Sequence, residues 1–233
     1  MELKTKDRIL LKSLELFNAD GERNVTTNHI SAALNISPGN LYYHYRSKED
    51  IIFALFQAYQ ASMLTSLGVP TDRVLTYEDK MGYLEAIFNQ LWEYRFLHRD
   101  LGHLLEESQR LRRAYREFAR EVMAQAYRVY AGLREADLVI LEEHEARALI
   151  VNIWIITTNW ASFVTSSGFF GDEVALDRNH LRRGLVQILS LEAPYLKGVA
   201  REKLPELWRR YELGEDESRP TPSQSVELGG LTD

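Results

Sequence analysis

The chain has 233 residues, with 28 Lys and Arg against 34 Asp and Glu, and a formal net charge of −6. Its length allows a sizeable hydrophobic core, and its acidic balance excludes a protein that binds nucleic acid through bulk positive charge. Because the sequence has no cysteine, disulfides, zinc–thiolate sites and thiol redox sensing are excluded. The N-terminus is charged and amphipathic, so we expect no signal peptide.

The first predicted helix covers residues 4–17, where apolar side chains recur at helical spacing. Gly21 predicts its end, because glycine often follows the last helical turn. Thr27 stands at the N-cap position before a second helical pattern at residues 29–34. The chain is therefore expected to begin with two helices joined by a short connection.

A third and shorter helical pattern, residues 38–44, follows a tight polar turn. Ser37 is its predicted N-cap, and Pro38 occupies the first helical position, where its missing N–H costs nothing. We expect Leu41 and Tyr45 to face inward. The side chains left outside are those of Ser37, Gly39, Asn40, Tyr42, Tyr43 and His44.

An exposed, aromatic helix of this length suits the major groove of DNA, where the second helix of a helix-turn-helix presents its N-terminal residues to base edges. Gly39 permits a close approach, and Asn40 is the best candidate for reading a base edge. Tyr43 and His44 are placed to reach a thymine methyl group or a phosphate. Any one of these residues, taken alone, could be a solvated surface residue. The coincidence of caps, turn and aromatic block favours DNA.

The charge distribution supports this interpretation locally. No Asp or Glu occurs between Arg23 and Lys48, whereas the 183 residues after position 50 carry 21 basic and 27 acidic side chains, the whole net charge. Thr27 and Lys48 are the predicted phosphate contacts. The acidic remainder would repel DNA, so binding should depend on the N-terminal surface alone.

Residues 25–53, VTTNHISAALNISPGNLYYHYRSKEDIIF, resemble the helix-turn-helix and the start of the fourth helix of the TetR family of bacterial transcriptional repressors. The body, with LWEYRFLHRDLGHLL and a later Trp-, Asn- and Thr-rich helix, resembles a branch of regulators near polyhydroxyalkanoate or acyl metabolism. The resemblance implies DNA contacts at the matching positions, which are Thr27, Ser37, Pro38, Gly39, Asn40, Tyr42, Tyr43, His44 and Lys48.

Helical patterns continue along the chain without any strand pattern, so we predict an all-α protein. An N-terminal three-helix helix-turn-helix DNA-binding domain is expected at residues 1–47, and a C-terminal helical bundle that binds an effector and dimerises at residues 48–213. Residues 214–233 are polar and rich in Pro, Ser and Gly, which predicts a disordered tail. The body helices are expected at residues 48–67, 75–94, 96–105, 108–135, 142–165, 177–191 and 195–211.

The most apolar stretch, residues 148–164, is interrupted by Asn and Thr and is expected to be too polar and too short for a membrane span. We predict a buried helix, no membrane partner, and a cytoplasmic, nucleoid-associated protein. The family resemblance and their apolar surface place the helices at 142–165 and 177–191 in a homodimer interface. The small residues Ala148, Ala161 and Ser162 would allow close crossing there, although these helices could instead fill the core of one subunit.

Ligand pockets are mostly apolar with a few convergent polar groups. Asn152 and Asn159 lie two helical turns apart on one face, and a buried Asn needs hydrogen-bond partners. A satisfied core or interface Asn is favoured over a ligand contact. A metal site at His98 and His103 is not favoured, because the aromatic crowding suits a small apolar or aromatic effector better than an ion. The candidate pocket residues are Trp92, His98, His103, Tyr127, Asn152, Trp154, Thr158, Asn159 and Trp160.

The expected function is a homodimeric repressor that an effector releases from a palindromic, double-stranded DNA operator. The alternative is a DNA-bound adaptor that recruits a protein partner and has no small-molecule effector. Catalysis is not expected, because the sequence has no G-x-S-x-G, P-loop or dinucleotide-binding glycine pattern. No cofactor is expected either.

Overall fold

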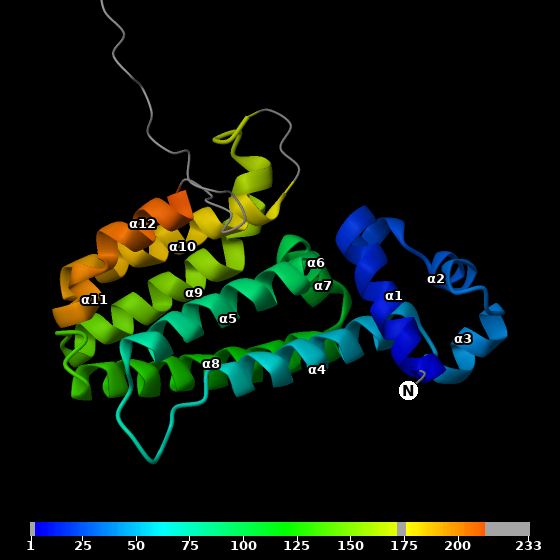
Figure 1. Cartoon of the computed structure of the whole chain (residues 1–233). Coiled ribbons are helices and arrows are strands. Elements are labelled where there is room, and N and C mark those ends of the chain that lie inside the picture. The colour runs from blue at the N-terminus through cyan, green and yellow to red at the C-terminus, as the bar shows by residue number, and fades with distance from the viewer. Residues whose placement is uncertain (1–2, 172–175, 213–233) are drawn as a thin grey trace, which may run out of the picture.

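The computed structural model describes residues 3–171 and 176–212, and within these ranges the chain is helical (Figure 1). The only β pairing in the described part is an isolated antiparallel bridge between Val139 and Leu196. The prediction of an all-α protein is confirmed. The predicted tail at 214–233 lies outside the described residues.

The N-terminal head consists of three short helices and one 3-10 turn around a small core. Ile9 and Phe17 from the first helix, Ile30 from the second and Leu41 from the third are all fully buried there. Gly21 has a φ of 86°, which L side chains rarely adopt, and ends the first helix by donating its N–H to Phe17 O. The elements are α1 (Thr5–Asp20), η1 (Glu22–Asn24), α2 (Thr27–Ala33) and α3 (Pro38–His44).

Side-chain caps fix the starts of α2 and α3. Thr26, and not Thr27, is the N-cap of α2, because its hydroxyl accepts the His29 N–H at 3.3 Å and His29 Nδ1 accepts the Thr26 N–H. The predicted cap was wrong by one residue, since either of two adjacent threonines fits the pattern. Ser37 caps α3 as predicted and accepts the Asn40 N–H at 3.1 Å.

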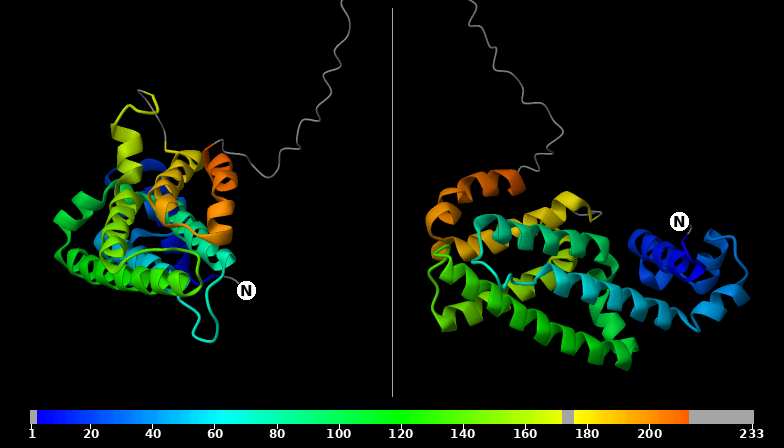
Figure 2. Two further views of the ribbon diagram at one scale, coloured as in Figure 1. Left: turned by 90° about the vertical axis from the view of Figure 1, so that its left-hand side faces the viewer. Right: turned by 60° about the horizontal axis from the view of Figure 1, so that its bottom comes forward.

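The body is a helical bundle in which α4 runs away from the head and α5 returns toward it (Figure 1). Helices α4 and α8 form one layer, α5 and α9 the next, and α10 with α12 covers the third side (Figure 2). The elements are α4 (Lys48–Ser66), α5 (Tyr77–Glu93), α6 (Arg95–Arg99), α7 (Leu101–Glu107), α8 (Gln109–Glu135), α9 (Glu143–Ser166), α10 (Arg178–Glu192), η2 (Ala193–Tyr195), α11 (Gly198–Glu202) and α12 (Leu204–Glu212).

Two predicted helices are each divided in the structure. The one at 96–105 is interrupted at Asp100, between α6 and α7. The one at 195–211 is wrong as a single helix, because Gly198 adopts a φ of 48° and Pro205 lies at the start of α12. Neither residue suits the interior of a continuous helix.

Helix α9 is less buried than predicted. By length and composition alone, it could cross a membrane. The sequence, in contrast, predicts a stretch that is too polar and too short for a membrane span. Helix α9 packs against α6, α8 and α10 with one face, while Val151, Ile155 and Phe163 on other positions are 43%, 52% and 40% exposed. The sequence predicts a buried helix, either in a dimer interface or in the core of one subunit, and within the subunit the structure leaves one apolar face open.

Helix α10, which the sequence also places in the dimer interface, has no comparable open apolar face. Its apolar residues, including Leu181, Leu185 and Ile188, are buried within the subunit, where α10 packs against α5, α9 and α12. Its outward positions carry Arg183 and Gln187. Of the two helices predicted for a dimer interface, only α9 therefore presents a broad apolar face.

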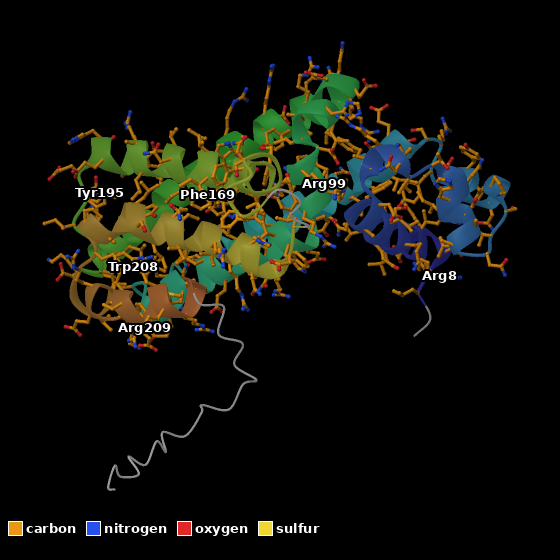
Figure 3. All side chains as sticks on the ribbon, turned by 90° about the horizontal axis from the view of Figure 1, so that it is seen from above. Arg8, Arg99, Phe169, Tyr195, Trp208 and Arg209 are labelled. Carbon is orange, nitrogen blue, oxygen red and sulfur yellow. The ribbon has the colours of Figure 1, made fainter. Side chains whose placement is uncertain are left out.

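A polar joint connects the head to the body at the turn between α5 and α6. Asn18 at the end of α1 donates to Glu93 O at 2.7 Å and accepts the Phe96 N–H at 3.1 Å. Arg99 donates to Phe17 O at 2.8 Å, and its side chain lies where the two parts meet (Figure 3). The rings of Phe17 and Phe96 pack 5.3 Å apart beneath these bonds. The end of α1 is thus fixed to α6.

Candidate DNA-binding surface and effector cavity

The outer side of α3 is open to solvent. Leu41 and Tyr45 face inward as predicted, with 0% and 5% exposure, whereas Tyr43 is 85% exposed. A tyrosine ring with so much exposed surface contributes little to the head's own core. The other predicted contacts of α3 are also exposed, except His44, which is half-buried: Ser37, Pro38, Gly39, Asn40 and Tyr42.

A hydroxyl pair that the sequence did not predict connects α2 to α3. Thr27 Oγ1 and the Tyr42 hydroxyl lie 3.1 Å apart, within hydrogen-bonding distance. Thr27 is partly buried and Tyr42 is 47% exposed, so the bond lies at the surface of the helix-turn-helix. The bond fixes the Tyr42 ring relative to α2. Each of the two hydroxyls can still form a further hydrogen bond.

Lys48 has a partner within the protein. Its Nζ lies 2.6 Å from Glu22 Oε1 and donates to Glu22 O at 3.0 Å. The Glu22 side chain is buried, whereas that of Lys48 is 31% exposed. The pair holds the first turn of α4 against η1. The predicted phosphate contact stays a prediction, and it would require a lysine whose charge is already balanced by Glu22.

A cavity of about 100 Å³ lies in the body, lined by side chains from α4, α5, α6, α8, α9 and α10. Its walls are mainly aliphatic and aromatic. Three of the nine predicted pocket residues, His98, Trp154 and Thr158, line it. The aliphatic lining comes from Met63, Leu67, Leu84, Ile87, Leu91, Val122, Met123, Ala126, Val129, Leu133, Ile150, Ile153 and Ile188.

His98 is the unusual polar group of this cavity. It is 6% exposed, and neither ring nitrogen has a hydrogen-bond partner. Its ring meets Tyr59 edge to face at 5.4 Å between centroids. Burial lowers the pKa of His98 to about 4, so the imidazole is neutral near pH 7. A neutral imidazole offers one donor and one acceptor nitrogen, and both are left unused.

A buried ion pair that the sequence reasoning missed lies elsewhere on the cavity wall. Lys80 Nζ is 2.7 Å from Glu192 Oε2, with both side chains 4% exposed. The Tyr130 hydroxyl donates to the other Glu192 oxygen at 2.5 Å. Burial, and Glu192 beside it, raise the pKa of Tyr130 well above its usual range. The available signal was that Lys80 and Glu192 fall on the apolar stripes of α5 and α10.

Three other predicted pocket residues lie away from the cavity. Trp92 lies beside an open cleft between α1 and α5, under the Arg95 guanidinium at 4.2 Å. His103 lines a surface groove beside Lys48. Tyr127 on α8 is 36% exposed. Aromatic and imidazole side chains on these helices therefore do not all face one interior.

The last three predicted pocket residues belong to other surfaces of α9. Asn152 and Asn159 do share a face, as their spacing predicted, but that face is the exposed one that carries Ile155. The Asn159 amide donates to Ile155 O at 3.0 Å. Trp160 donates its indole N–H to His180 O at 2.7 Å. Its ring packs on Gly184, where an added Cβ would come within 2.9 Å.

No group of three or more His, Asp or Glu residues in the described ranges is arranged to hold a metal ion. His98 and His103, where the sequence does not favour a metal site, line different spaces. His98 lies in α6 and His103 in α7, and the break at Asp100 turns one toward the interior and the other toward the surface groove.

Two family models match the chain. Residues 9–55 match the model of bacterial regulatory proteins of the tetR family, and residues 58–204 match a model of bacterial transcriptional repressors. A crystal structure of a TetR-family transcriptional regulator from Marinobacter aquaeolei VT8 is 45% identical. The comparison covers 90% of this chain and 99% of that one, with a TM-score of 0.80.

Curated relatives match over shorter stretches. The HTH-type transcriptional regulator TcmR from Streptomyces glaucescens is 23% identical over 58% of this chain and 62% of TcmR. The icaADBC biofilm operon negative regulator IcaR from Staphylococcus epidermidis is 29% identical over 39% of this chain and 45% of IcaR. The chain thus matches less than two thirds of the length of either relative. Since the repressor model alone covers more than half of the chain, the protein belongs to the TetR family of bacterial transcriptional regulators.

Proposed function

We propose that this DNA-binding regulator is a homodimeric repressor that a small apolar or aromatic effector releases from a palindromic operator. The cavity in the body carries the proposal. It is apolar and about 100 Å³ in volume, and it contains a buried His98 with two unused nitrogens. An adaptor without an effector would have no need of such a cavity, so the cavity favours release by a ligand.

The head, residues 1–47, is the proposed DNA-binding domain, and the body at 48–213 the effector and dimerisation domain. Asn40 and Tyr43, exposed near the start and end of α3, are the proposed base contacts. The remaining contacts are proposed to position the head on phosphates, and they comprise Thr27, Ser37, Pro38, Gly39, Tyr42, His44 and Lys48. We place the protein in the cytoplasm, at the nucleoid, where its operator lies.

The proposed dimer forms through the open face of α9. Val151, Ile155 and Phe163 are large apolar side chains that are each at least 40% exposed on this helix. A second copy that packs its α9 against them would bury this surface by a two-fold operation. Two heads could then occupy half-sites about 34–36 Å apart, one turn of DNA.

The proposed release works through the joint between α1 and α6. His98 in α6 lines the cavity, and the same short helix holds Arg99, which bonds to Phe17 O in α1. Asn18 also bonds to the turn before α6. An effector that binds better to a shifted α6 would favour a different head position, and affinity for DNA would fall by the same coupling factor. Helix α4 connects the same two parts along the chain and is the second proposed lever.

The test uses a DNA fragment selected by the purified protein. Fluorescence anisotropy would compare wild type with Asn40→Ala, with Asn28→Ala on the exposed side of α2 as the matched control. Light scattering would give the number of subunits per fragment. Two subunits per site and a loss confined to Asn40→Ala support the proposal. A single subunit per site, or equal losses in both variants, would contradict it.

A further inference from the structure

The chemistry of the cavity narrows the class of effector, an inference that rests on the proposed function. We propose that the cavity takes an uncharged, elongated, mainly aliphatic molecule whose single hydroxyl group hydrogen-bonds to His98.

The side chains that line the cavity are spread along the bundle. The lining on α5 extends from Lys80 to Leu91, which at about 1.5 Å per residue is about 16 Å of helix. The free volume of the cavity is small, about 100 Å³. A space of that length and volume suits an extended chain better than a fused ring system.

The cavity has no unbalanced charge. Lys80 and Glu192 are the only charged residues in its lining, and they neutralise each other at 2.7 Å. Tyr130 completes the hydrogen bonding of the Glu192 carboxylate. A ligand carboxylate or ammonium would therefore be buried without a free counter-charge, which is costly. The lining selects for an uncharged ligand.

The ligand's polar group is expected at His98. The two threonine hydroxyls there already donate within the protein: Thr158 to Trp154 O at 2.7 Å, and Thr157 to Ile153 O at 2.9 Å. Both nitrogens of His98 are buried without partners, and buried polar groups are nearly always paired in folded proteins. A hydroxyl can donate to one imidazole nitrogen or accept from the other, so it meets His98 in either orientation.

The experiment compares straight-chain ligands of similar length that differ only at one end. Octanol, octanoate, octylamine and the alkane nonane would be titrated calorimetrically and by melting-temperature shift against wild type, His98→Phe and His103→Phe. His103 lies in the surface groove outside the cavity and provides a matched histidine control. Octanol is expected to bind wild type and His103→Phe about tenfold more tightly than the other three, the effect of one good hydrogen bond. His98→Phe should bind octanol no more tightly than nonane, because the buried hydroxyl then has no partner.

Octanoate or octylamine binding as tightly as octanol would overturn the inference and leave the proposed effector cavity standing. An octanol preference that survives in His98→Phe would overturn it in the same way. Failure of all four ligands to bind wild type would count against the effector cavity itself. If His98→Phe does not fold, the order of the four affinities in wild type still decides whether the cavity prefers the alcohol.

Discussion

Replacing His98 by phenylalanine should make the protein more stable and less sensitive to acid. The substitution keeps a ring beside Tyr59 and removes two buried nitrogens that have no partners. An unsatisfied buried polar group costs about 1–3 kcal/mol, so the variant should gain roughly that amount near pH 8. A residue whose replacement by an apolar side chain stabilises the protein is expected to serve ligand binding and not folding.

The acid sensitivity follows from the pKa of His98, which burial lowers from 6.5 to about 4. Below pH 6.5 the unfolded chain binds a proton at His98, whereas in the folded chain this histidine stays neutral until the pH approaches 4. The free energy of unfolding therefore falls as the pH falls toward 4. Between pH 8 and pH 5 this linkage removes about 2 kcal/mol from the wild type. The loss should be absent from His98→Phe, which has nothing to protonate at this position.

Urea unfolding at one fixed protein concentration, at pH 8 and pH 5, measures both effects. The free-energy gap between His98→Phe and wild type should widen by about 2 kcal/mol at the lower pH. The other histidines are common to both proteins, so their titration cancels in this comparison. A gap that stays constant between the two pH values, or a variant that is less stable at pH 8, would refute the reasoning.

Three further predictions concern DNA, assembly and the buried ion pair. Asn40→Ala should weaken operator binding by about 1–3 kcal/mol in an anisotropy titration, and an unchanged affinity would remove Asn40 from the base contacts. Ile155→Glu places a charge on the open face of α9 and should convert a dimer to monomers in light scattering, whereas Gln187→Glu on α10 should not. Glu192→Ala leaves Lys80 buried and unpaired and should lower the unfolding free energy by about 3–5 kcal/mol, and the double variant with Lys80→Met should recover most of it. Equal losses in the single and double variants would show that the pair does not act as a unit.

The exposed side of α3, which is the proposed DNA-binding surface, could be predicted from the sequence because its determinants are local. Ser37, Pro38 and the inward Leu41 and Tyr45 lie within nine residues, and their caps and spacing alone define how α3 is presented. The adjacent cap was misplaced by one residue, since Thr26 and Thr27 are chemically identical.

The cavity could be predicted only in part because it depends on residues that are distant in sequence. Lys80 and Glu192 meet across 112 positions, and no helical periodicity reports such a pairing. Single-helix patterns identified Trp154 and Thr158 but could not separate them from Asn152 and Asn159 on the opposite side of α9. The resemblance of the body to regulators of acyl or polyhydroxyalkanoate metabolism stays a prediction.

Selection of genomic DNA fragments by the purified protein tests the central claim most directly, when the bound fragments are sequenced and searched for a shared motif. The structure predicts a palindrome with half-sites about one helical turn apart, close to a small number of promoters. It also predicts that Asn40→Ala changes the preferred base in each half-site. Weak binding without a shared sequence, lost at modest salt, would contradict sequence-specific reading by α3.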